Sequence, residues 1–191
     1  FATVADNVRL DGGALSFQQA ATIPATRGIQ VGSPVAGNLT AGALDIGGSA
    51  LNTLTYAGVI ANRGTAAGAL SKTGVGILVL SGANTYTGRT LVSGGQLFLA
   101  NAATLAGGSS LEVSGATVDL LGNSQSGANA LGAVTVAGGS LLASGRSLAT
   151  AGTLAATSFS FGYDNGAVAD SVVTAKLSGA SLTKVSRSEE H

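Results

Sequence analysis

Apolar side chains alternate with small or polar side chains in short segments along most of the chain. The clearest segments are residues 77–80, 96–99 and 117–120, and each lies close to a Gly-Gly or Ser-Gly pair. Alternation with a period of two places every second side chain on one face of a β-strand, and glycine-containing pairs mark tight turns. The pattern predicts an all-β fold of short strands that each bury one face.

The alternating segments recur at similar spacings. Residues 76–80 align with residues 95–99 at a 19-residue offset, and further units begin at Gly115 and Gly139. Self-similarity at a period of about 20 residues is typical of a solenoid, in which each strand stacks on the equivalent strand of the next coil. The repeats therefore predict a β-solenoid with coils of about 20 residues.

An antiparallel sandwich would also contain many short strands, so the two folds have to be compared. The tight hairpins of a sandwich favour Asn-Gly or Asp-Gly turns, and the chain has only Asp11-Gly12 and Asn165-Gly166 of this kind. In-register stacking explains the recurring apolar pairs, which a sandwich leaves unexplained. We therefore predict a parallel β-helix in which Leu78 and Leu80 face the interior beside Leu97 and Leu99.

Composition and charge narrow the range of functions. The chain has 30 Gly, 2 Pro and no Cys. Because 45% of its residues are apolar, it can bury enough surface to fold. Nine basic and nine acidic side chains are spread thinly, and without a basic surface we expect no nucleic acid as a partner. No apolar run approaches the ~20 residues that span a bilayer.

Residues 70–97 read LSKTGVGILVLSGANTYTGRTLVSGGQL and closely resemble the passenger-associated transport repeat of bacterial autotransporters. Residues 175–184 resemble the opening of a second, truncated copy. The positions that carry the resemblance in the full copy are Lys72, Gly74, Gly76, Leu78, Leu80, Gly82, Asn84, Tyr86, Gly88, Thr90, Val92, Gly95 and Leu97.

The resemblance implies a passenger of type V secretion, with the coils of a right-handed parallel β-helix over residues 1–184 as a single elongated domain. Residues 185–191 form a polar tail that breaks the repeat pattern and is typical of a sequence appended to a protein. The implied location is secreted or at the cell surface, anchored at the bacterial outer membrane. The implied partner is a C-terminal outer-membrane translocator barrel in the full-length protein.

The implied function is a structural segment that supports folding and transport across the outer membrane and serves as a surface scaffold. The alternative is an adhesin-type binding module that contacts a host surface, a glycan or another cell, or that self-associates. A polysaccharide-active β-helix enzyme is a more distant third.

Each residue type in the motif has a structural interpretation. We expect the motif glycines at corners that need positive φ or close backbone approach. Asn84 is expected to stack in a polar ladder or cap a turn, and Tyr86 to cover a coil edge.

Ile77, Val79 and Phe98 should face outward as an exposed apolar contact strip, because the 19-residue offset places Val79 beside Phe98. Ordinary strand-surface packing and a contact surface for another molecule both remain open for this strip.

The sequence offers little for catalysis. Glu112 and Asp119 are the nearest approach to a carboxylate pair, and they are seven residues apart. Lys72-Thr73-Gly74 and Ser181 to Lys184 match two elements of penicillin-binding enzymes, but in reversed order. His191 is the only histidine and lies at the end of the sequence. We therefore expect no enzyme, no cofactor and no bound metal.

Overall fold

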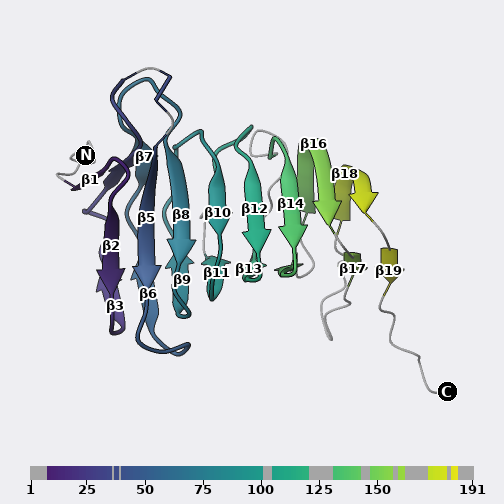
Figure 1. The fold of residues 1–191 in the computed structure, drawn as a ribbon, viewed down its shortest axis with the longest axis horizontal. Coiled ribbons are helices and arrows are strands. Elements are labelled where there is room, and N and C mark those ends of the chain that lie inside the picture. The colour runs from purple at the N-terminus through teal and green to yellow at the C-terminus, as the bar shows by residue number, and fades with distance from the viewer. Residues whose placement is uncertain are drawn as a thin grey trace.

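The computed structural model describes residues 8–35, 37–38, 40–100, 105–120, 131–142, 147–156, 159–161, 172–179 and 182–184, with side chains described as far as residue 142. All regular secondary structure in these ranges is β-strand. The strands lie side by side along an elongated structure, and the coils advance from one end to the other in chain order (Figure 1).

The strands form three main parallel sheets and one short additional pair. Sheet A contains β1 (Val8–Leu10), β4 (Ile29–Val31) and β7 (Ile60–Asn62). Sheet B contains β2 (Ala14–Phe17), β5 (Ala41–Ile46), β8 (Ala69–Thr73), β10 (Thr90–Val92), β12 (Leu111–Ser114), β14 (Val134–Ala137), β16 (Ser147–Ala156) and β18 (Val172–Gly179). Sheet C contains β3 (Ala21–Ile23), β6 (Thr53–Tyr56), β9 (Ile77–Leu80), β11 (Gln96–Leu99), β13 (Thr117–Asp119) and β15 (Ser140–Leu142), and β17 (Phe159–Phe161) pairs with β19 (Leu182–Lys184).

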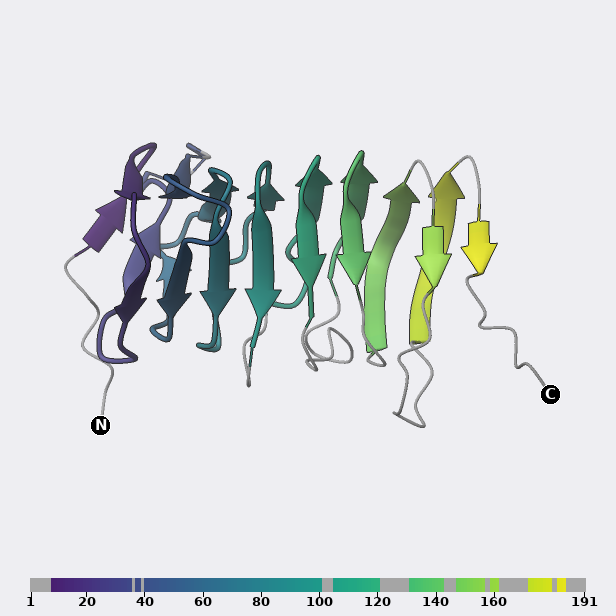
Figure 2. The same ribbon diagram turned by 90° about the horizontal axis from the view of Figure 1, so that it is seen from below.

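Each described strand pairs with described strands of the neighbouring coils and not with its neighbour in the sequence, and every described pairing is parallel. Seen from below, sheets B and C lie on different sides of the same stack (Figure 2). This arrangement is a parallel β-helix, so the predicted fold class is confirmed.

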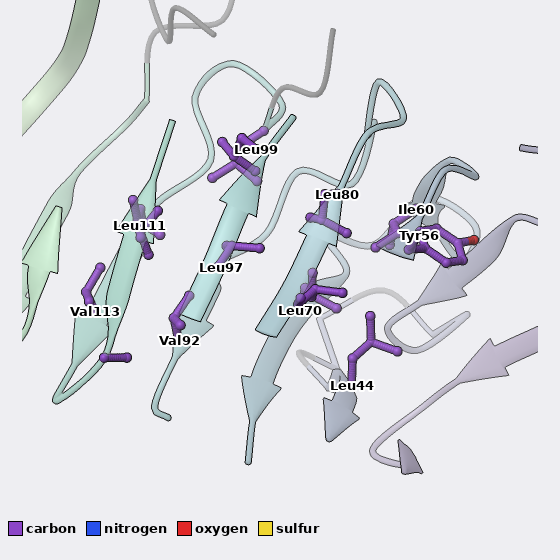
Figure 3. Close-up of a cluster of buried hydrophobic side chains, with 14 of the residues drawn as sticks. Leu44, Tyr56, Ile60, Leu70, Leu80, Val92, Leu97, Leu99, Leu111 and Val113 are labelled. Atoms are coloured by element: carbon purple, nitrogen blue, oxygen red, sulfur yellow. The ribbon is translucent and has the colours of Figure 1, made fainter. Parts of the chain in front are cut away.

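The predicted 19-residue register between β9 and β11 is also confirmed. Leu78 pairs with Leu97 and Leu80 with Leu99, and all four side chains are fully buried. Alternation along each strand turns the leucines inward, where they form one continuous apolar column between the sheets (Figure 3). Each fully buried leucine contributes about 1.5–3 kcal/mol to stability.

The predicted coil length, taken from the spacing of the later repeats, is wrong for the first coils. In sheet B, Leu15 pairs with Leu44 and Leu44 with Lys72. The next two steps, from Lys72 to Val92 and from Val92 to Val113, are clearly shorter and agree with the predicted length. The first coils are longer because each contributes a strand to sheet A, and in the described part of the chain this sheet ends at β7.

Within the described ranges there is no helix of sufficient length and apolarity to cross a membrane.

Candidate functional site

The transport-repeat motif occupies two successive coils. It begins on β8, passes through β9 and β10, and ends on β11. Its inward-facing side chains are at most 1% exposed, and they are Leu70, Lys72, Leu78, Leu80, Tyr86, Thr90, Val92 and Leu97. The inward-facing positions of the motif therefore build the interior, whereas most of the positions between them stay partly or fully exposed.

The motif glycines lie where consecutive coils approach each other closely. Gly74 and Gly95 have positive φ angles of 73° and 60°. A Cβ atom on Gly95 would collide with the carbonyl oxygen of Gly76, which belongs to the previous coil. The same obstruction, by an atom of the coil before, exists at Gly74, Gly76, Gly82 and Gly88.

Lys72 lies in the core although its side chain carries an ammonium group. The residue is 0% exposed. Its Nζ donates hydrogen bonds to the carbonyl oxygens of Thr73 at 2.7 Å, Gly74 at 2.9 Å and Gly94 at 3.0 Å. An ammonium has three N–H donors, so these three carbonyls satisfy it completely.

The surroundings of Lys72 shift its ionisation. Burial lowers the pKa of Lys72 from 10.5 to about 8, because the charged form loses its hydration, and the carboxylate of Asp45 opposes this shift. Asp45 itself accepts hydrogen bonds from Thr73 Oγ1 at 3.0 Å and from Ser16 Oγ at 2.9 Å. A polar ladder on the outer face of sheet B therefore connects β2, β5 and β8.

Asn84 caps the last strand of sheet A. Its Oδ1 accepts a hydrogen bond from the backbone N–H of Ile60 at 3.0 Å, while the Ile60 carbonyl accepts one from the N–H of Thr85 at 2.8 Å. Asn62 extends the contact, since its Oδ1 accepts hydrogen bonds from the N–H groups of Gly68 and Thr87. The segment after β9 thus pairs with the edge of β7 without forming a strand.

Tyr86 corrects one expectation from the sequence. It does not cover a coil edge, because its side chain is 0% exposed and lies in the core. The Tyr86 hydroxyl is 2.6 Å from the hydroxyl of Thr90, which is also fully buried. Burial raises the pKa of Tyr86, and the hydrogen bond to Thr90 opposes that shift only in part.

Ile77, Val79 and Phe98 point outward on sheet C and are partly exposed. Val79 pairs with Phe98, as the 19-residue offset implies, and Thr55 and Asp119 flank the two on the neighbouring strands. The apolar strip is thus short and is bounded by polar residues along the axis of the coils.

Two apolar side chains that sequence reasoning missed are more exposed than the strip. Leu51 is 85% and Val75 57% exposed, and both lie in the turns that join sheets B and C on consecutive coils. Their exposure could have been predicted from their positions inside Gly-rich turns, because a residue in a tight outer turn has no core to face.

The candidate catalytic residues do not come together in the described structure. Arg89 Nη1 lies 2.6 Å from Glu112 Oε2 in a surface ion pair, and Asp119 belongs to the other sheet. All three N–H donors of the Lys72 ammonium are hydrogen-bonded to carbonyls inside the core. No group of three or more His, Cys, Asp or Glu side chains that could hold a metal occurs among the described residues. Ser181 and His191 lie outside those residues.

Comparison with known proteins gives two matches. Residues 70–97 match the family described as passenger-associated-transport-repeat. The chain is 36% identical over 170 residues to the adhesin BmaC autotransporter of Brucella suis biovar 1 (strain 1330), which covers 84% of this chain and 5% of that protein. The chain thus spans about one-twentieth of the length of this relative. No solved structure matches the chain.

Proposed function

The chain belongs to the passengers of bacterial autotransporters, and from this premise we propose that its transport repeat is a folding unit that supports export and stabilises a surface scaffold. Passengers of this family are secreted or displayed at the cell surface, which is the location expected from the sequence. The observation that carries the proposal is the nearly complete burial of the inward-facing side chains of the motif over two coils.

The stacking of the two coils supports a role in folding. Leu78 and Leu80 contact the equivalent Leu97 and Leu99 of the very next coil, so the pairing closes a short loop. A solenoid folds through contacts between neighbouring coils, and a stable pair of coils can therefore nucleate the next ones. Residues 70–99 have the properties of such a nucleus.

A nucleus of this kind can favour export by a ratchet. An unfolded passenger can slide in either direction through a narrow channel, whereas a folded pair of coils outside the membrane cannot re-enter it. In the full-length protein the channel is a C-terminal outer-membrane translocator barrel, which is the partner that we propose. Folding outside then makes the movement unidirectional without another source of energy.

The test is surface display of the full-length protein with Leu78→Asp or Leu97→Asp. Each change places a carboxylate in the apolar core and should prevent stacking of β9 on β11, so the amount of passenger at the surface should fall. Gln96→Asp is the matched control, because residue 96 lies on the same strand and points outward. Undiminished display of both core variants would contradict the proposal.

An adhesin-type binding module is the second candidate. The matched relative is named an adhesin, and the outer surface of sheet C carries partly exposed Ile77, Val79 and Phe98. Binding of the chain to glycan and matrix-protein arrays, compared with the variant V79T/F98T, tests this function. Binding that the double variant loses would favour the adhesin, and the absence of binding by the unsubstituted chain would favour the scaffold.

A further inference from the structure

Lys72 interrupts a column of aliphatic side chains. The residues in register with it along the interior of sheet B are Leu44, Val92, Val113 and Val136. All four are buried, and an aliphatic side chain would fit the pattern at position 72 as well. A buried charge rarely adds stability relative to a well-packed apolar residue, so the lysine calls for another explanation.

The carbonyl groups around the ammonium come from two different coils. Thr73 is the last residue of β8 and Gly74 lies in the turn that joins β8 to β9, whereas Gly94 belongs to the turn that joins β10 to β11. The two turns stack directly, since a Cβ atom on Gly94 would lie 2.9 Å from the carbonyl oxygen of Gly74. The third hydrogen bond of Lys72 therefore exists only after the second coil has closed over the first.

We propose that Lys72 couples the β8–β9 coil to the β10–β11 coil, so that the transport repeat folds and opens as one unit of two coils. While the second coil is open, the ammonium lacks the Gly94 carbonyl and has to remain hydrated. A first coil that closed alone would bury a charge with an unsatisfied N–H group, which is unfavourable. The two coils are consequently stable together and unstable singly.

Asp45 does not replace Gly94 of the second coil as a hydrogen-bond acceptor for Lys72. Its two carboxylate oxygens accept hydrogen bonds from Thr73 and Ser16, on the outer face of sheet B. The carboxylate favours the charged form of Lys72 through its field, but the described hydrogen bonds of the ammonium all go to backbone carbonyls. Completion of this carbonyl site therefore depends on Gly94.

Hydrogen exchange measured by mass spectrometry on the whole chain tests the coupling. Peptides that contain the Ile77 amide report on the first coil, and peptides that contain the Gln96 amide report on the second, because both amides donate to carbonyls of the preceding coil. In the unsubstituted chain the two coils, as reported by these amides, should open at the same rate. In Lys72→Met the rates should separate by at least ~10-fold, a difference within the usual range of coupling energies.

Ser71→Met is the matched control, since it introduces the same side chain at the neighbouring, outward-facing position of β8. Equal opening rates in this control and unequal rates in Lys72→Met are the expected result. Equal rates in both variants would overturn the proposal.

A second measurement needs no loss of the lysine and so remains informative if Lys72→Met does not fold. Acetylation of Lys72 by an amine-reactive ester should proceed no faster than exchange of the Gln96 amide, whereas the lysine of Ser71→Lys should react without any opening. Acetylation of Lys72 while β11 stays protected would contradict the coupling. The proposal rests on the proposed function only for its role in export, and both measurements are independent of export, so the two can fail separately.

Discussion

The hydroxyl of Tyr86 lies 2.6 Å from that of Thr90, and both side chains are completely buried in the core of the transport repeat. The two residues are close neighbours in the sequence, so one short segment places two polar groups in an apolar core, where they satisfy each other.

Removing both hydroxyls of this pair should cost less than the two single removals added together. Tyr86→Phe leaves the Thr90 hydroxyl without its buried partner, and we expect a loss of about 1–3 kcal/mol in the free energy of unfolding. Thr90→Val should behave similarly from the other side. The double variant should lose less than the sum of the two, and a double-mutant cycle from urea unfolding measures the difference. Strict additivity would contradict the pairing.

The stability of the chain should depend on alkaline pH through Lys72. Its pKa is about 8 in the folded state and 10.5 for an ordinary lysine. Between these values the unfolded chain binds more protons, so the free energy of unfolding should rise with pH from about 8 toward 10.5. At lower pH both states are protonated, and Lys72 contributes no slope. Urea unfolding at a series of pH values measures the rise, which Lys72→Met should abolish.

Tyr86 should reverse this trend at higher pH. Burial raises its pKa above the ordinary value of 10.0, so the unfolded chain loses the phenolic proton first. Above that pH the free energy of unfolding should therefore fall, and in Tyr86→Phe this contribution to the fall should disappear. The same fall in the chain and in the variant would show that Tyr86 is not the group responsible.

Two glycines allow the effect of coil approach to be separated from that of the backbone angle. Gly95 and Gly115 have similar φ angles of 60° and 64°, but only Gly95 has backbone atoms where a Cβ would lie. Gly115→Ala should cost roughly 1–2 kcal/mol from the left-handed conformation alone. Gly95→Ala should cost clearly more, because the collision with Gly76 forces the coils apart. Comparable losses in thermal or urea unfolding would refute the role assigned to close approach.

The sequence predicted the features that depend on regular repetition. The 19-residue offset between residues 76–80 and 95–99 indicated the register of β9 and β11, because similar coils stack with equivalent residues in contact. The longer first coils escaped prediction, since sheet A is built from very short strands between irregular segments. Such short strands have too few positions to show a period.

The burial of Lys72 and Tyr86 escapes prediction from the sequence for a different reason. A charged or hydroxyl-bearing side chain usually indicates the surface, and this general preference outweighed the local pattern. The signal for Lys72 was nevertheless present, because Leu70 and Lys72 occupy alternate positions on one strand and must share a face. For Tyr86 no strand surrounds the residue, so alternation could not indicate its direction.

The end of sheet A at β7 has a mechanical consequence. Pulling from the C-terminal end would peel away coils that, in the described structure, are held mainly by the ladders of sheets B and C, until the transport repeat is reached. Beyond it, each coil adds a third ladder, and an ion pair between Arg63 and Asp11 spans from the coil of β7 to the coil of β1. Resistance to tension should therefore increase stepwise at the boundary that Asn84 marks, making the repeat the place where a stretched rod stops unravelling.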